Sequence, residues 1–354
     1  MKKLTRREFI KLSGAAAAAG LLVGCSGRAA PKPSTSREDV LKFHPDAPSK
    51  VVHAHHAGVW TDTPTVGSLA DSAEENDLLS PEALRELLDA SIVELTGLEK
   101  ARDAWAVLFS PDERIAIKVN AFRNSLIWTH VPLVTAVTDS LQDAGIPPEQ
   151  IVIFDYYTSE LEKAGFLINE DGPGVRCCGT ESNYTQEGTV KGMSIEFSDI
   201  LLECDTLINM PVLKSHMIAG LSFAMKNHYG SIRSPSHLHG DIGRAMSELN
   251  ALSPIKDRTR LIVGDALTAC LRYGGVFPYW TSDRIGDSIL LSFDPVAADT
   301  TALQMLGQFL ADEGDEPQSV LLEMAATPCL ESGAEAGLGT NDPANIDLKE
   351  ITVG

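Results

Sequence analysis

The residues best able to do acid–base or nucleophilic chemistry are concentrated in one segment near the middle of the chain. Lys214 and His216 follow an apolar run that ends near Asn209, and Lys226 and Asn227 come shortly after them. Residues two apart share a face of an extended chain, so Lys214 and His216 can act together. A lysine crowded by other cations has a lowered pKa and can act as a base or nucleophile, and histidine suits proton transfer. Lys214, His216 and Lys226 are therefore the candidate catalytic residues.

Other polar residues stand where further apolar runs end; in addition, Asn227 closes the helix expected after His216, and Asp299 lies one turn into the helix expected from Pro295, from where it could orient a lysine or histidine of the pocket. Ligands of α/β sheets bind outside the carboxyl ends of the strands, so such residues are candidates for substrate binding. The candidate substrate-binding residues are Lys118, Asn120, Asn209, Asn227, Asp265 and Asp299. The alternative is that single Asp and Asn residues cap the next helix, which is the first interpretation of Asp294 before Pro295. Lysines, amides and an imidazole together predict a cationic pocket for a small anion, either a carboxylate or a phosphate.

A second constellation could bind a metal ion. His237 and His239 are two apart and Asp241 follows, which are ligand types used by zinc and other divalent ions. The alternative is a polar loop that lines the active site without a metal. Trp280 lies on a glycine-rich loop and could also face a ligand, whereas most tryptophans pack in a core.

The elements that would position these residues alternate between strands and helices. Apolar runs predict strands over residues 50–53, 114–120, 151–155, 206–210, 260–265 and 288–294. Helices are expected from Pro81, over residues 132–144, and from Pro295 to about Phe309. Strands that are apolar throughout and alternate with helices predict an α/β fold. We expect a mainly parallel sheet with helices on both faces, in a single large domain over residues 49–354.

The central segment resembles the domain-of-unknown-function 362 family. The resemblance rests on residues 205–216, which read Asp-Thr-Leu-Ile-Asn-Met-Pro-Val-Leu-Lys-Ser-His, and on the Lys-Asn pair with a nearby glycine at residues 226–230. Residues 117–120 and 294–300 extend it over nearly all of residues 50–310. The resemblance implies an architecture rather than an activity. Many members carry a ferredoxin-like cysteine module; this chain has no such spacing, so no iron–sulfur cluster is expected, and the cofactor is unknown.

The N-terminus predicts export. Arg6 and Arg7 precede an apolar stretch over residues 12–23, as in a twin-arginine signal peptide, so the export machinery of that route is an expected partner. Residues 22–25 resemble a lipoprotein box, in which Cys25 is lipidated; the alternative is an ordinary cleaved signal. We expect a signal peptide over residues 1–24, a flexible tether over 25–48, and a lipid-anchored protein in the periplasm or on the outer face of a membrane.

The charge balance limits the possible partners. The chain carries a formal net charge of −20; residues 1–24 hold five basic side chains and one acidic one, which leaves 24 basic and 48 acidic side chains. Such a surface repels phosphate backbones, so nucleic acid is not an expected partner. It also disfavours contact with anionic lipid, so membrane attachment should come only from the lipid anchor.

Three functional hypotheses follow from these observations. The first is an exported enzyme that binds a small anionic substrate and catalyses proton abstraction or elimination on a carboxylate-bearing molecule. The second is a non-catalytic binding or accessory lipoprotein. The third is a metal-dependent enzyme that uses the loop with His237 and His239.

Overall fold

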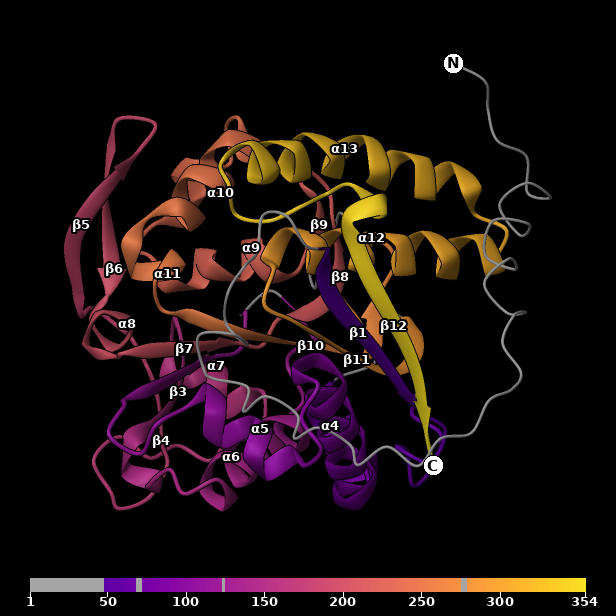
Figure 1. Cartoon of the computed structure of the whole chain (residues 1–354). Helices are drawn as coiled ribbons and strands as arrows, with labels where there is room; N and C mark the ends of the chain where they lie inside the picture. The colour runs from indigo at the N-terminus through magenta and orange to yellow at the C-terminus, as the bar shows by residue number, and fades with distance from the viewer. Residues whose placement is uncertain (1–47, 68–71, 123–124, 275–278) are drawn as a thin grey trace, which may run out of the picture. The chain divides into compact units, whose positions relative to one another are not determined.

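The computed structural model describes residues 48–67, 72–122, 125–274 and 279–354 (Figure 1). The twin-arginine signal, Cys25 and the tether up to residue 47 lie outside the described residues, and the predictions about them stay predictions. All of the described residues belong to one structural unit. None of the helices in these ranges combines the length and the apolar character that a membrane span needs.

A ten-stranded sheet forms the centre of the described part of the fold. Eight strands lie side by side in the order β12 (Ile346–Val353), β1 (Ser49–His56), β11 (Arg284–Ser292), β10 (Thr259–Cys270), β7 (Thr206–Asn209), β2 (Ile115–Lys118), β3 (Ile151–Asp155) and β4 (Arg176–Gly179). β10 also pairs with β8 (Val212–His216), and β8 pairs with β9 (Gly220–Ser222). Strands from β10 through β4 are parallel, and β11 runs antiparallel to both of its neighbours. The prediction of a mainly parallel sheet is confirmed.

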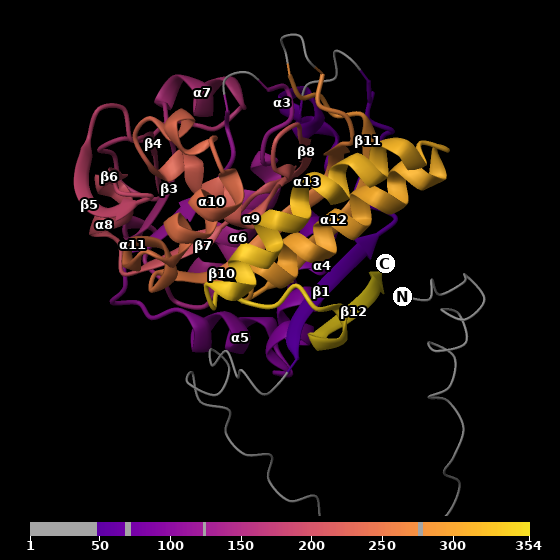
Figure 2. The same ribbon diagram turned by 90° about the horizontal axis from the view of Figure 1, so that it is seen from above.

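Helices cover both faces of the sheet, as predicted (Figures 1 and 2). One face carries α4 (Pro81–Thr96), α5 (Ala101–Leu108) and α6 (Val131–Asp143). The other carries α9 (Ala224–Asn227), α10 (Ile242–Ala251), α12 (Pro295–Asp312) and α13 (Glu316–Glu335). Because strand side chains alternate in direction, Ile117 joins the core under α4 and α6, whereas Ala116 joins the core on the opposite face.

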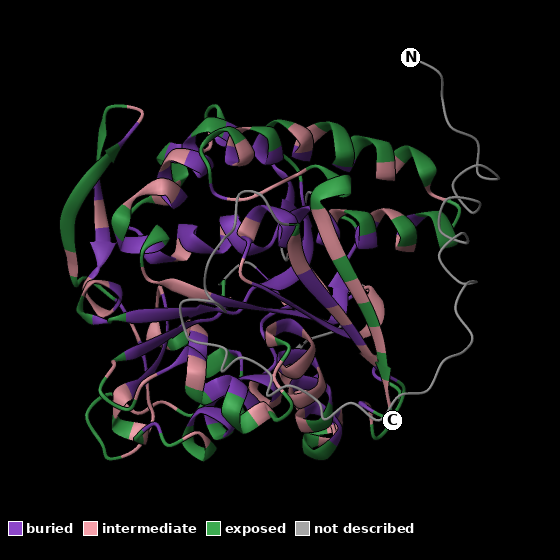
Figure 3. Cartoon of the chain, viewed as in Figure 1, coloured by how far each residue is buried: buried purple, intermediate pink, exposed green. Residues whose placement is uncertain are grey.

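Shorter elements complete the described chain. They are α3 (Ser72–Glu75), α7 (Thr158–Lys163), the hairpin of β5 (Tyr184–Val190) and β6 (Met193–Ser198), α8 (Asp199–Glu203), α11 (Ser253–Lys256), and the 3-10 helices η1 (Asn76–Leu78), η2 (Pro148–Gln150), η3 (His228–Ser231), η4 (Pro235–Leu238) and η5 (Pro343–Asn345). Figure 3 shows that the central strands are buried, whereas much of the β5–β6 hairpin is exposed.

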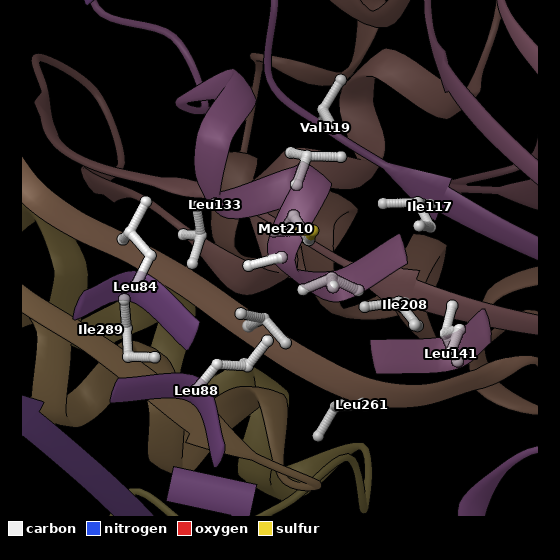
Figure 4. Close-up of a cluster of buried hydrophobic side chains, with 14 of the residues drawn as sticks. Leu84, Leu88, Ile117, Val119, Leu133, Leu141, Ile208, Met210, Leu261 and Ile289 are labelled. Carbon is white, nitrogen blue, oxygen red and sulfur yellow. The ribbon is translucent and has the colours of Figure 1, made fainter. Parts of the chain in front are cut away.

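The core between the sheet and α4–α6 holds the site strands in place. Leu84 and Leu88 of α4 and Leu133 of α6 lie with Ile117 and Ile208 of the central strands in one apolar cluster (Figure 4). Each of these side chains is fully buried. Full burial of one such side chain contributes roughly 1.5–3 kcal/mol, so this cluster stabilises the packing of β2 and β7 against α4 and α6.

Two helices begin where the sequence predicts. Ser80 caps α4 by accepting a hydrogen bond from the amide of Ala83 at 3.2 Å, ahead of Pro81. Asp294 caps α12: its Oδ1 accepts from the amides of Val296 and Ala297, both at 2.8 Å. The interpretation of Asp294 as a helix cap is therefore confirmed.

The extent of one strand differs from the prediction. We expected Asp265 at the carboxyl end of its strand, but β10 continues five residues further, to Cys270. An acid fits inside this buried strand because its carboxylate has partners, among them the ring of His130 at 2.9 Å. Asp265 is therefore a buried mid-strand residue.

Candidate active site

A cavity of about 380 Å³ opens where β2, β3 and β8 meet α9 and η3. Six of the nine residues predicted for catalysis and substrate binding line it, namely Lys118, Asn120, Lys214, His216, Lys226 and Asn227. Residues that the prediction did not assign also line it, among them Asp155, Tyr156, Tyr157, Glu160 and Tyr229. Asp155 ends β3 and the two tyrosines follow it directly, so the strand-end position is the signal that points to them.

Three asparagine amides form a continuous hydrogen-bonded relay that runs from the cavity wall to the residue behind it. Asn120 Nδ2 donates to Asn227 Oδ1 at 3.0 Å, and Asn227 Nδ2 donates to Asn209 Oδ1 at 2.7 Å. Asn209 Nδ2 in turn donates to the carbonyl oxygen of Ala224 at 2.8 Å. Since each amide donates to the next acceptor, the orientation of all three is determined by the carbonyl at the end. Asn120 Oδ1 is thereby left as an acceptor at the cavity.

That acceptor receives Lys214. Its Nζ donates to Asn120 Oδ1 at 2.7 Å and lies 5.2 Å from the centroid of the Trp280 ring. The side chain is 2% exposed, and within the described part of the chain no carboxylate forms an ion pair with it. Burial lowers the pKa of Lys214 to about 7, and the nearby Lys226 acts in the same direction. Near neutral pH, Lys214 therefore has a large neutral fraction that can act as a base or a nucleophile.

Lys118 lies next to this relay but has a different partner. Its Nζ is 2.8 Å from Asp155 Oδ1 and donates to the carbonyl of Val119 at 2.6 Å. Burial lowers the pKa of Lys118, and the Asp155 carboxylate opposes that shift. A Cβ atom at Gly230 would lie 2.5 Å from Asp155 Oδ1 and 2.6 Å from Lys118 Nζ, so only glycine leaves room for the pair.

His216 lies on β8 two residues after Lys214, and the extended strand places both at the cavity as predicted. Its Nδ1 accepts hydrogen bonds from the amides of Ile218 at 3.2 Å and Ala219 at 3.1 Å. The ring proton must therefore be on Nε2. Burial lowers the pKa of His216 to about 2, and the neighbouring Lys226 adds to the effect. His216 is thus a neutral hydrogen-bond donor through Nε2, and its predicted role in proton transfer stays a prediction.

Lys226 is the least constrained cation of the cavity. Its Nζ lies 4.3 Å from the centroid of the Tyr229 ring, and among the described residues it forms no ion pair. Burial lowers its pKa to about 8, so it is mostly protonated at neutral pH. Two carboxylates, Asp155 and Glu160, line the same cavity, and Asp155 is paired with Lys118. Lys226 is therefore the cation best placed to receive an anionic ligand.

An aromatic wall stands beside the lysines. The ring of His216 stacks against Trp280 at 5.8 Å and against His239 at 5.9 Å between centroids. Trp280 Nε1 donates to the carbonyl of Ser215 at 2.7 Å, which fixes its loop to β8. Trp280 lines the cavity, so the glycine-rich loop does place this tryptophan where a ligand can reach it; residues 275–278 of that loop lie outside the described residues.

The candidate metal ligands do not come together. His239 lines the cavity and stacks on His216, whereas His237 is exposed and Asp241 forms an ion pair with Lys191 at 3.3 Å. Across the ranges that the structure describes, no group of three or more His, Cys, Asp or Glu side chains is placed to hold a metal ion. The loop therefore contributes an aromatic ring to the cavity rather than a set of ligands.

Three predicted substrate-binding residues lie away from the cavity surface. Asn209 is buried behind it as the third member of the relay. Asp299 is buried under α9, where its carboxylate accepts from the amides of Ala224 at 2.6 Å and Met225 at 3.1 Å. Asp265 is in contact with His130 instead. These residues hold the backbone that carries the site and do not face a ligand.

A buried charged cluster was missed entirely. His130 Nδ1 lies 2.9 Å from Asp265 Oδ2, and His130 Nε2 lies 3.0 Å from Glu75 Oε2, with all three side chains almost fully buried. Burial alone would lower the pKa of His130, but Asp265 and Glu75 outweigh it and raise the pKa to about 10. His130 precedes α6 and Glu75 ends α3, 55 residues earlier, so no local pattern links them. The cluster joins α3, α6 and β10.

These observations define the chain as an α/β protein with a cavity at its strand ends, and lysine and asparagine side chains line that cavity. The chain belongs to the family described as Domain of unknown function (DUF362), whose family model matches residues 115–304. That range includes the three relay asparagines and the three cavity lysines. A search of the curated proteins found no match.

Similar solved structures share little sequence with the chain. One is a protein from Thermotoga maritima, with 14% identity and a TM-score of 0.37, which aligns over 66% of this chain and 59% of its own. Another is the lactate racemase apoprotein from Thermoanaerobacterium thermosaccharolyticum, with 12% identity and a TM-score of 0.36, over 69% and 57% respectively. The chain thus spans less than two thirds of the length of either structure.

Proposed function

We propose that this chain is an exported enzyme that acts on a small anionic, carboxylate- or phosphate-bearing molecule. The single observation that carries the proposal is a cavity with two lysines that no carboxylate pairs with in the described part of the chain. A buried ammonium without a charged partner is costly to keep in a structure, so Lys226, which is mostly protonated at neutral pH, favours an anionic ligand in this cavity.

The three candidate catalytic residues take different roles in this proposal. The ammonium of Lys226 binds the anionic group, and the Nε2 hydrogen of His216 donates to a second oxygen of the substrate. Lys214 is the base: its amine, held by Asn120, removes a proton from the carbon next to the carboxylate. The reaction class is proton abstraction or elimination. The aromatic wall excludes water from one side of the cavity.

Binding is tested first. Purified full-length protein is screened by thermal shift against small carboxylates and inorganic phosphate, and the shift should be lost in Lys226→Met. Removal of a charged hydrogen-bonding partner should weaken binding by about 10- to 100-fold. Lys349→Met is the matched control, because Lys349 lies on β12, where it pairs with Asp347 at 2.8 Å. Equal shifts in Lys226→Met and wild type would show that the cavity is not the binding site.

Catalysis is tested on a ligand found in that screen. The ligand is incubated with the protein in deuterated water, and the loss of its α-hydrogen signal is followed by proton NMR. We expect exchange with wild type and none with Lys214→Met. A ligand that binds through Lys226 but never exchanges would favour a non-catalytic binding lipoprotein instead.

Export and anchoring belong to the same proposal. The Arg6–Arg7 pair and the lipobox at Cys25 support delivery by the twin-arginine machinery and attachment through a lipid. Exchange of both arginines for lysine should retain the protein in the cytoplasm. Cys25→Ser should release an exported form from the membrane fraction; a Cys25→Ser protein that stays in that fraction contradicts a lipid anchor.

A further inference from the structure

We infer that Lys214 is a covalent catalyst: its amine forms an imine with a carbonyl carbon, and the substrate is a small 2-oxo acid. This inference rests on the proposed function, because it uses the same cavity and the same anion-binding Lys226. It adds that the substrate has a carbonyl group next to its carboxylate, so Lys214 acts through a covalent bond in place of its role as the free base, and the proton to be removed lies on C3.

The surroundings of Lys214 Nζ are those that a nucleophilic amine needs. An amine attacks a carbonyl only when it has lost its proton, and a carboxylate partner would keep that proton in place. Here the partner at 2.7 Å is an amide oxygen, which carries no formal charge. Lys118, on the neighbouring strand end, has a carboxylate at 2.8 Å instead. Of the described lysines that line the cavity, Lys214 on β8 is therefore the one whose buried amine has an amide oxygen as its hydrogen-bond partner.

The amide relay also sets the direction of the amine. Asn120 cannot rotate its amide without losing its bond to Asn227, so its oxygen stays an acceptor for one hydrogen of Lys214. With one N–H fixed by Asn120 and the ring of Trp280 5.2 Å away, the amine is held at the cavity wall. A fixed nucleophile loses little conformational freedom when it reacts.

Two further groups match the remaining parts of a 2-oxo acid. The Nε2 hydrogen of His216 is available to the carbonyl oxygen, since Nδ1 is occupied by backbone amides. The ammonium of Lys226 is available to the carboxylate. Both line the cavity with Lys214. A neutral donor at the carbonyl and a cation at the carboxylate fit the polarity of a 2-oxo acid.

The step balances without a cofactor. The lone pair of Lys214 Nζ adds to the carbonyl carbon, which becomes a carbinolamine after transfer of one N–H hydrogen to the oxygen. The C–O bond then breaks, and the oxygen leaves as water with both hydrogens of the original amine. The product is a C=N bond between Lys214 and the substrate. Protonated from solvent, the imine becomes an iminium that withdraws electrons and makes the C–H bonds of the adjacent carbon, C3 of a 2-oxo acid, more acidic, which suits proton abstraction or elimination.

The test is reductive trapping. Full-length protein is incubated with pyruvate or glyoxylate and cyanoborohydride, which reduces the imine to a stable secondary amine, and peptides are mapped by mass spectrometry. We expect one adduct, on Lys214, that forms at least tenfold faster than any adduct on Lys349. Lys214→Arg keeps the positive charge but cannot form an imine, so it should lose the adduct. Lys226→Met should slow labelling by pyruvate but not by acetone, which lacks the carboxylate.

The outcomes separate this inference from the proposed function. If both oxo acids shift the thermal unfolding of wild type but neither gives an adduct on Lys214, the imine is refuted and the anion site stands. If the adducts are confined to exposed lysines and no carboxylate or phosphate shifts the unfolding, both fail. An adduct that forms on Lys226 in preference to Lys214 also overturns the assignment. Mapping the adduct on wild type does not depend on how well the variants fold.

Discussion

The substitution Asn120→Asp should keep the amine of Lys214 protonated and unreactive, with almost no change in side-chain volume at residue 120. It places a carboxylate where an amide oxygen now accepts from Lys214 Nζ at 2.7 Å. An opposite charge at this distance raises the pKa of a lysine by one to three units, and more where both groups are buried. The amine would then be held as an ammonium at neutral pH.

The size of the effect follows from the present pKa of about 7. The face of Trp280 favours the ammonium by roughly 0.5–2 kcal/mol. The lowering from 10.5 corresponds to on the order of 5 kcal/mol, so burial dominates over the aromatic ring. At pH 8, a lysine with a pKa of about 7 is about 90% neutral, and one with a pKa of about 10 is about 1% neutral. The reactivity of Lys214 should fall about a hundredfold.

The assay is competitive labelling with trace acetic anhydride, which acylates only neutral amines. The yield of the Lys214 peptide is measured against that of Lys349, an internal reference on β12. After correction for the neutral fraction of the reference, labelling of Lys214 should be half-maximal near pH 7 in wild type and near pH 10 in Asn120→Asp. Unfolding would also return Lys214 to the ordinary lysine pKa of about 10.4, so circular dichroism must show that Asn120→Asp is folded across the pH range.

A matched variant separates charge from the loss of the amide. Asn120→Ala removes the acceptor without adding a charge, so Lys214 should keep its low pKa and its reactivity. Both variants lose the hydrogen bond from Asn120 Nδ2 to Asn227 Oδ1, which costs about 1–3 kcal/mol of stability. Because this loss is common to both, a difference between the two variants reports the added charge. Equal labelling of Lys214 in Asn120→Asp and Asn120→Ala at pH 8 would falsify the assignment of a neutral amine.

Three further predictions concern the framework. Burial lowers the pKa of His130, but the two carboxylates that contact it outweigh burial and raise the pKa to about 10. The protonated ring therefore stabilises the fold fully below about pH 6.5, and this stabilisation is lost as the pH rises toward 10. In urea unfolding, the stability difference between wild type and His130→Gln should shrink by about 4 kcal/mol between about pH 6.5 and 9.5, whereas a constant difference contradicts a protonated ring. Asp294→Ala should lower the free energy of unfolding by about 2 kcal/mol through loss of the α12 cap, with Asp294→Asn closer to wild type; no change in unfolding midpoint would show that the cap is dispensable. Gly230→Ala should separate Lys118 from Asp155 and lower the melting temperature, and an unchanged melting curve would mean that the pair can shift away from the added methyl group.

The convergence of the lysines and amides could be predicted because it follows from topology. Asn120 and Asn209 stand at the ends of parallel neighbours, β2 and β7, and parallel strands end at the same edge. Lys214 and His216 share a face because β8 stays extended. Periodicity and strand direction were sufficient to bring these side chains together, and they required no knowledge of side-chain contacts.

The role of His216 could not be predicted in the same way. Its type suggested proton transfer in general, and the sequence does not show that the tight turn between β8 and β9 directs the amides of Ile218 and Ala219 at Nδ1. Asp265 and Asp299 show the same limit. Their positions after or within apolar runs suggested a ligand, whereas long-range partners 135 and 75 residues away occupy their oxygens. Sequence patterns predict which residue types stand at an edge of the sheet, but they do not show which polar atoms already have hydrogen-bond partners.

The difference between Lys118 and Lys214 is the clearest argument for a reactive amine. Both are buried lysines at the rim of one sheet, and they share the cavity. The chain has 49 acidic side chains, so carboxylates are abundant, yet Lys118 has Asp155 as its partner and Lys214 has an amide whose orientation is fixed by two further amides. An Asp in place of Asn120 would neutralise a buried charge and stabilise a purely structural lysine. Asn120 instead holds the amine through a neutral amide oxygen, which is oriented by two further asparagines and does not oppose loss of the proton, as a reactive amine requires.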